Sequence, residues 1–273
     1  MTRPTKLLVL ISDIHGGSTQ SLLPPGFENH EGNPIGQNAV QRWLWSCWLA
    51  AQKFADEVTG DDPFALLING DAVEGNHHRT TQVISPEIGD HIRCAEQVLE
   101  HFTKRAARTF VVRGTECHTG DAEKAIGKAL GAERHPATGA HAADAWDLEI
   151  MGVRINARHH CSATSRRWLE SGEYSRFLIN EQAEAIRNGE RPPEICIRSH
   201  RHRGGHFLDG GGLALVTPAW QALTRHAHKV VPSARTQPGI QILDWRNRGH
   251  GELPEVHWRS YKAPAASAVN ICP

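Results

Sequence analysis

Histidine and acidic residues form five short motifs, each of which follows an apolar segment of the chain. In order, the motifs are Asp13-Ile-His15, Gly70-Asp71-Ala-Val-Glu74, Gly114-Thr-Glu116-Cys-His118, His159-His160 and Ser199-His200-Arg-His202. Carboxylates and imidazoles together suit Zn, Mn or Fe, whereas a thiolate site would need paired cysteines. One such motif alone is more often an ordinary loop feature than a metal site. Five in series indicate one shared metal centre.

The elements expected in the first half of the chain would bring three of these motifs together. Apolar runs at residues 6–12, 64–69 and 109–113 predict strands that are buried on both faces. Apolar residues recur at helical spacing over residues 38–58 and again after Ser85-Pro86-Glu87, where Ser85 is expected to cap a helix. Alternating strands and helices predict a largely parallel sheet. Motifs at the carboxyl ends of its strands would converge on one crevice.

The second half of the chain is richer in antiparallel strands. Helices are expected at about residues 121–130 and 165–188, and strands at 146–150, 153–158, 194–198, 206–208, 213–217, 240–245 and 255–261. The first two of these strands form a hairpin around Met151-Gly152, and His226 and His228 are expected on a loop. Because no linker divides the chain, we expect a single domain over residues 1–273, in which the segment from about 218 to 273 completes the sheet and the pocket.

In their order and separation, the five motifs resemble those of the calcineurin-like metallophosphoesterase superfamily, which reads DxH, GDxxD, GNH[DE], a strand-end His and GHxH. The resemblance covers about residues 7–206. It implies an α/β fold, a four-layer sandwich of two mixed β-sheets flanked by helices, and a site for two divalent metal ions. Three positions depart from the pattern: Glu74 replaces the second Asp, Gly114-Thr-Glu-Cys-His118 replaces Gly-Asn-His, and Ser199 replaces the Gly of GHxH. The second variant is similar to bacteriophage-encoded members.

The resemblance also implies a set of metal ligands. One cation would be held by Asp13, His15 and His202. The other would be held by Glu116, His200 and either His159 or His160, and Asp71 would bridge the two cations. If Glu116 points away, Asn69 or Asn76 would take its place.

The remaining candidates surround these ligands. Glu74 would support the ligands from outside. His118 would stabilise the developing charge or protonate the leaving group. The candidate phosphate contacts are His78, Arg79 and Arg113, because guanidinium groups pair well with phosphate. A solvated loop is as good an explanation for the first two, and Arg113 could instead bond to the carboxylates.

The activity implied is hydrolysis of phosphodiester or phosphomonoester bonds by a metal-activated hydroxide. Nucleic acid and nucleotides are among the candidate substrates. Two other functions stay open: a catalytically weak metal-binding scaffold, and a binuclear hydrolase of a non-phosphate ester. Turnover of phosphate esters would separate the three.

Composition limits the partners and the compartment. Lys and Arg number 30, as do Asp and Glu, so no overall basic field favours nucleic acid. The 18 histidines favour metal binding, and the six cysteines form no CxxC pair, which is typical of free thiols in a reducing compartment. The apolar run before Asp13 is too short for a signal peptide or a membrane span. We therefore expect a cytoplasmic protein without a membrane partner.

Overall fold

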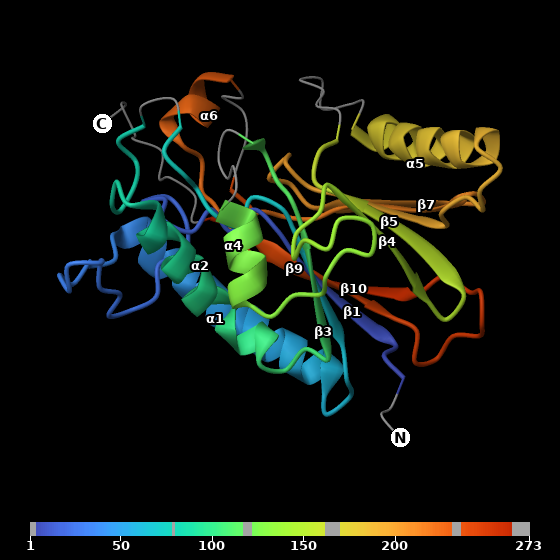
Figure 1. Cartoon of the computed structure of the whole chain (residues 1–273), viewed down its shortest axis with the longest axis horizontal. Helices are drawn as coiled ribbons and strands as arrows, with labels where there is room; N and C mark the ends of the chain where they lie inside the picture. Colours follow the sequence, from blue (N-terminus) through green and yellow to red (C-terminus); the bar gives the residue numbers. More distant parts are fainter. Residues whose placement is uncertain (1–3, 78–79, 117–121, 162–169, 231–235, 264–273) are drawn as a thin grey trace, which may run out of the picture.

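The computed structural model describes residues 4–77, 80–116, 122–161, 170–230 and 236–263, and two β-sheets pack face to face between layers of helices (Figure 1). The predicted α/β fold, a sandwich of two mixed sheets flanked by helices, is confirmed. Among the described residues, no helix combines the length and the apolar composition that crossing a membrane requires.

The first sheet contains the three strands predicted in the first half of the chain. β1 (Leu7–Ile11), β2 (Ala65–Asn69) and β3 (Arg108–Val112) run parallel, because helical segments connect them. β9 (Gly239–Asp244) pairs antiparallel with β1, and β10 (Glu255–Ser260) pairs antiparallel with β9. The strand order is therefore β10-β9-β1-β2-β3.

The second sheet is built from the middle of the chain in the order β4-β5-β6-β8-β7. β4 (Ala145–Ile150) and β5 (Val153–Arg158) form the predicted hairpin. β6 (Ile195–Arg198) is parallel to β5 and to β8 (Gly212–Val216), whereas β7 (Gly205–Asp209) is antiparallel to β8. The carboxyl ends of β5 and β6 carry the last two motifs to the same edge of this sheet.

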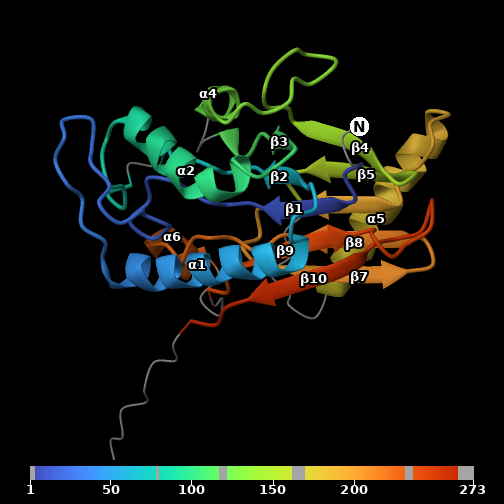
Figure 2. The ribbon, with the colours of Figure 1, turned by 90° about the horizontal axis from the view of Figure 1, so that it is seen from below.

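Helices cover the outer face of each sheet (Figures 1 and 2). α1 (Ala39–Thr59), α2 (Ile88–Thr103) and α4 (Ala122–Ala129) pack on the first sheet, and α5 (Glu170–Arg187) packs on the second. α1 begins with a capping box, in which Asn38 Oδ1 accepts from the backbone of the third helical residue at 2.9 Å.

The alternating side chains of β1 divide it between two apolar cores. Leu7, Val9 and Ile11 pack against the helices, whereas Leu8 and Leu10 pack against the second sheet. All five side chains are fully buried. The carboxyl end of β1, where the first motif begins, is thus fixed from both sides.

The expected cap of α2 is wrong. The helix begins at Ile88 with Glu87 at the N-cap, and no side chain caps it. Ser85 Oγ instead accepts a hydrogen bond from the backbone N–H of Glu87 at 3.1 Å. The hydroxyl closes a local turn before the helix, which is the competing use of serine near helix starts.

The expected loop around His226 and His228 is also wrong, because this segment forms the short helix α6 (Arg225–Val230). Thr224 precedes the helix, and its Oγ1 accepts from the backbone N–H of Ala227 at 3.2 Å. A threonine in this position is an N-cap signal that a six-residue helix makes easy to overlook.

Candidate metal centre

Backbone hydrogen bonds hold the turns after β1 and β2 against each other. The N–H of Asp13 donates to Gly70 O at 3.0 Å, and the N–H of His15 donates to Asp71 O at 2.9 Å. These turns continue parallel strands whose registers are already paired. The first two motifs therefore lie side by side because the sheet places them there.

Candidate ligands occupy a strained backbone conformation. Five non-glycine residues that follow strand ends have positive φ: Asp13 (49°), His15 (47°), Asp71 (50°), His200 (69°) and His202 (56°). Among the described residues only one other non-glycine residue does so, in the β4–β5 turn. Such conformations cost on the order of 1 kcal/mol or more each and gather at functional sites. The positive φ angles therefore lower the stability of the fold while they direct these side chains toward one point.

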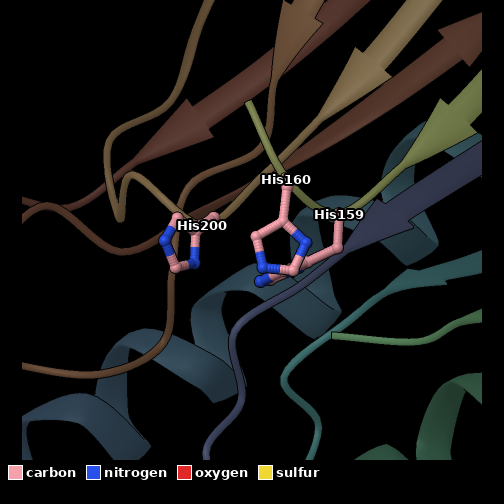
Figure 3. Close-up of side chains that lie close together, drawn as sticks. All are labelled: His159, His160 and His200. Atoms are coloured by element: carbon pink, nitrogen blue, oxygen red, sulfur yellow. The ribbon is translucent and has the colours of Figure 1, made fainter. Parts of the chain in front are cut away.

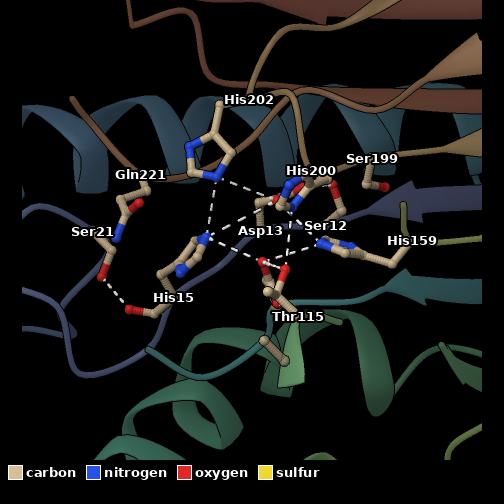
Figure 4. A network of polar contacts seen from close by, with 12 residues as sticks. Ser12, Asp13, His15, Ser21, Thr115, His159, Ser199, His200, His202 and Gln221 are labelled. Atoms are coloured by element: carbon tan, nitrogen blue, oxygen red, sulfur yellow. Dashed lines mark hydrogen bonds and ion pairs between the residues drawn. The ribbon is translucent and has the colours of Figure 1, made fainter. Parts of the chain in front are cut away.

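A first group of ligand atoms is formed by Asp13, His15 and His202, and all three lie within 4.8 Å of one another (Figure 4). His202 Nε2 is 3.4 Å from Asp13 Oδ1 and 3.2 Å from His15 Nε2. The other ring nitrogen of His15, Nδ1, lies 2.8 Å from Glu74 Oε2. A carboxylate on the far nitrogen fixes the ring and leaves Nε2 for a metal, as is usual for metal-ligating histidines.

A second group is formed by His159, His160 and His200, whose rings gather at the ends of β5 and β6 (Figure 3). His159 Nε2 is 3.1 Å from Asp71 Oδ2, and its Nδ1 lies 2.7 Å from the carbonyl oxygen of Asn69. Burial and the charge of His159 lower the pKa of His160 and of His200, which favours the neutral, metal-binding form of both rings.

Asp13, Asp71 and His159 form a third group, which connects the other two. All three residues are buried. Asp13 Oδ1 and His159 Nε2 are inaccessible to solvent, and beyond their ion-pair contacts with His202 and Asp71 they make no hydrogen bond of good geometry. Buried polar atoms are almost always satisfied, so such a pair calls for an unseen partner such as an ion. The donor set therefore fits divalent cations.

Glutamate 116 does not lie where the sequence analysis expected it. Its side chain is exposed, and it belongs to none of the ligand groups that the described residues form. Gly114 packs against Asp71, so the residue that follows it directly, Thr115, faces the cluster instead. The two alternative residues do not take its place. Asn69 Nδ2 donates to the carbonyl oxygen of Arg158, and Asn76 Nδ2 donates to the carbonyl oxygen of Pro86.

Thr115 is a site residue that the sequence analysis missed. Its N–H donates to Asp71 Oδ1 at 2.6 Å, and its hydroxyl donates to Asp71 Oδ2 at 3.1 Å. The same hydroxyl lies 3.1 Å from His200 Nδ1 and 3.4 Å from His160 Nε2. The signal was present in the sequence, because Thr115 follows Gly114 in the position that Asn has in the GNH motif.

Two glycines allow the ligands to approach so closely. A Cβ atom on Gly70 would lie 2.3 Å from His159 Nδ1, and a Cβ on Gly114 would lie 2.1 Å from Asp71 Oδ1. The fully buried Glu123 of α4 joins the same two turns, since its carboxylate accepts from the N–H groups of Ala72 and Gly114. Burial, with the charge of Asp71, raises the pKa of Glu123 to about 7.

A chain of buried hydroxyl and amide groups runs beneath the ligands. Ser12 Oγ donates to Asp13 Oδ2 at 2.5 Å and lies 2.6 Å from Thr217 Oγ1. Thr217 Oγ1 lies 2.5 Å from Ser199 Oγ, which accepts from Asn69 Nδ2 at 2.5 Å. Since the carbonyl of Asn69 also contacts His159, the chain connects ligands of the first and the second group. Ser199, the departure from GHxH, is one of its links.

The buried carboxylates of the centre raise the pKa values of two of its histidines. Burial opposes a charge on His15, but the hydrogen bond to Glu74 and the charges of Asp71 and Asp13 raise its pKa to about 9. Burial likewise opposes a charge on His159, but the bond to Asp71 and the charge of Asp13 raise its pKa to about 10. Without a metal, protonated imidazoles thus neutralise the buried carboxylates.

The other predicted site residues fall in two classes. His78, Arg79 and His118 lie outside the described residues, and their roles stay predictions. Arg113 Nη1 donates to Asp144 Oδ1 at 3.0 Å, at the side of the centre, and its role in binding phosphate also stays a prediction.

No protein-family model matches the sequence, and no curated protein matches it. Solved structures that resemble this one include Vps29 from Entamoeba histolytica complexed with Zn²⁺. The two are 12% identical with a TM-score of 0.45, and the match covers 94% of this chain and 98% of the Vps29 chain. An archaeal phosphodiesterase is 14% identical with a TM-score of 0.44 (94% and 99% covered). A putative 5'-nucleotidase from Staphylococcus aureus is 11% identical with a TM-score of 0.44 (97% and 56% covered). At these identities and TM-scores the similarities carry no argument about the site, whose assignment rests on the residues of this chain.

Proposed function

We propose that this protein is a binuclear metal-dependent phosphoesterase that hydrolyses phosphodiester or phosphomonoester bonds. The observation that supports it is the position of the buried Asp71 carboxylate. One of its oxygens lies 3.9 Å from His15 Nε2 of the first group and 3.1 Å from His159 Nε2 of the second. A carboxylate between two imidazole-rich groups is the arrangement that a pair of bridged cations needs.

The ligands are assigned from the groups that the side chains form. The first cation would be held by Asp13, His15, His202 and Asp71. The second would be held by Asp71, His159, His160 and His200, with the Thr115 hydroxyl beside them. The candidate metals are Mn, Zn and Fe, and a group with three imidazoles favours Zn or Fe over a harder cation.

When bound, such a pair supplies a Lewis acid for the phosphoryl oxygens and lowers the pKa of water to near neutrality. The chain's own residues fix the geometry. Glu74 and the carbonyl of Asn69 orient the rings of His15 and His159 from behind. Thr115 holds both oxygens of Asp71. No side chain needs to form a covalent intermediate.

The finer assignments also remain proposals. The substrate is a phosphate ester, with nucleic acid and nucleotides among the candidate classes, and the chain is proposed to act in the cytoplasm without a membrane partner. The bacteriophage-type subgroup rests on the Gly114-Thr115 variant alone. His118 is proposed as the group that assists the leaving oxygen.

The test is turnover of bis-p-nitrophenyl phosphate and p-nitrophenyl phosphate after loading with Mn²⁺, Zn²⁺ or Fe²⁺. We expect hydrolysis of at least one ester by the wild type and a loss of at least about 100-fold in Asp71→Asn, since one buried ligand charge is removed. Asp61→Asn, the same change on an exposed turn after α1, should leave activity unchanged.

The two alternative functions predict different outcomes. Metal uptake without turnover of any ester would indicate a metal-binding scaffold. Turnover of p-nitrophenyl acetate, but of neither phosphate ester, would indicate a hydrolase of carboxylic esters.

A further inference from the structure

A cavity of about 470 Å³ opens beside the second ligand group. His159 and His160 are among its lining residues, as are Asn180 and Glu181 of the helix α5. The volume is in the range of ligand pockets in proteins. A molecule whose scissile phosphate lies at the metal centre could therefore extend past His160 into this space.

The cavity contains two guanidinium groups that share a single carboxylate. Arg198 Nη2 lies 2.8 Å from Glu181 Oε1, and Arg158 Nε lies 3.6 Å from the same oxygen. The other acidic residue of the lining, Asp144, is paired with Arg113 at 3.0 Å. Two arginine charges of the cavity therefore face one glutamate charge, which leaves a net positive charge there.

The two arginines differ in their freedom to bind a ligand. The side chain of Arg198 is 3% exposed, and its Nη1 donates to the carbonyls of Asn156 (3.2 Å) and Ile197 (2.9 Å). Arg158 is 51% exposed, and its ion pair with Glu181 is the longer one. Arg198 is therefore fixed as part of the wall, whereas Arg158 can turn its guanidinium toward a ligand.

We infer that this cavity binds a second phosphate group of the substrate through Arg158. The inference rests on the proposed function and narrows it: the substrate carries a phosphate beyond the one that is hydrolysed, as a nucleoside bisphosphate or a nucleic-acid strand does. The planar guanidinium fork matches phosphate oxygens. A neutral or apolar leaving group would gain nothing from a half-exposed arginine that already lies beside the Arg198–Glu181 ion pair.

The test uses two esters that differ by one phosphate. Thymidine 5'-(4-nitrophenyl phosphate) and its 3'-phosphorylated form share the scissile bond and the reporter group. For the wild type we expect kcat/KM about tenfold higher on the 3'-phosphorylated ester, a typical gain for one charge-assisted contact. Arg158→Ala should reduce this ratio to about one, while its activity on bis-p-nitrophenyl phosphate stays near that of the wild type.

Arg154→Ala is the matched control, because Arg154 lies four residues earlier on β5 and does not line the cavity. It should keep the tenfold ratio. A 5'-terminal 4-nitrophenyl ester of a short oligothymidylate identifies the source of the second phosphate. A kcat/KM above that of the bisphosphate indicates a strand, a lower one indicates a free nucleotide, and Arg158→Ala should remove the gain in both cases.

A binding measurement separates this inference from the proposed function. By calorimetry without added metal, thymidine 3',5'-bisphosphate should bind the wild type more tightly than thymidine 5'-phosphate, and Arg158→Ala should abolish the difference. If no ester is hydrolysed, the proposed function fails, and the calorimetry still decides the inference. Equal ratios and equal affinities in the wild type and Arg158→Ala would overturn the inference even if the phosphoesterase activity is present.

Discussion

Replacing Gly114 by alanine should disable the centre although the new side chain is a single methyl group. The added Cβ would lie 2.1 Å from Asp71 Oδ1 and 2.3 Å from the Asp71 backbone nitrogen, whereas ordinary contacts begin at 3.4 Å. Either Asp71 or the turn after β3 must therefore move by about 1 Å, and a displacement of that size costs on the order of 100-fold in catalysis. The crowding should also lower the free energy of unfolding by about 1–3 kcal/mol.

The assay compares Gly114→Ala with Gly36→Ala, because a Cβ at Gly36 meets no atom within 4 Å. Phosphodiester turnover and the number of bound cations are measured for both variants, and urea unfolding shows that both are folded. We expect Gly114→Ala to lose about 100-fold in kcat/KM and to bind at least one cation more weakly. A folded Gly114→Ala variant within threefold of the wild type, with unchanged metal content, would refute this account of Asp71.

Three further predictions follow from the groups around the ligands. Ser199→Ala breaks the buried chain between Thr217 and Asn69, so urea unfolding should show a loss of about 1–3 kcal/mol from unsatisfied polar groups; an unchanged midpoint would contradict it. Glu74→Gln should weaken the first cation by about 10–100-fold in a chelator competition, because the carboxylate behind a ligand ring is removed; equal affinity would count against this role. The folded-state pKa values of His15 and His159 are raised to about 9 and about 10. The stability that these two groups give the metal-free protein is therefore fully present below pH 6.5 and is lost as the pH rises toward 10. Unfolding midpoints of the metal-free protein that do not fall over this pH range would contradict the prediction.

Much of the fold was predictable because its strands are unbroken apolar runs. The predicted ranges 6–12, 64–69 and 109–113 became β1, β2 and β3, whose residues are nearly all buried. Burial on both faces leaves a strong sequence signal. The start of α2 was not predictable in the same way, because the hydroxyl of Ser85 can close a turn as well as cap a helix.

The candidate site was predictable as a set of strand-end motifs but not in its details. Aspartate and histidine adopt positive φ more often than most residues, but tertiary packing decides that Asp13, Asp71 and His200 do so at these strand ends. The choice between Glu116 and Thr115 likewise depends on how closely Gly114 packs against Asp71. The sequence of one turn does not predict which turn of another strand it will contact.

The most direct test is a crystal of the protein grown with Mn²⁺ and measured at a wavelength where manganese scatters anomalously. We predict two anomalous peaks about 3.5–4 Å apart with the Asp71 carboxylate between them, a spacing typical of two-metal sites. One peak should lie against His15 and His202, and the other against His159 and His200. A fully metal-loaded crystal with a single peak, or with peaks away from Asp71, would contradict the account.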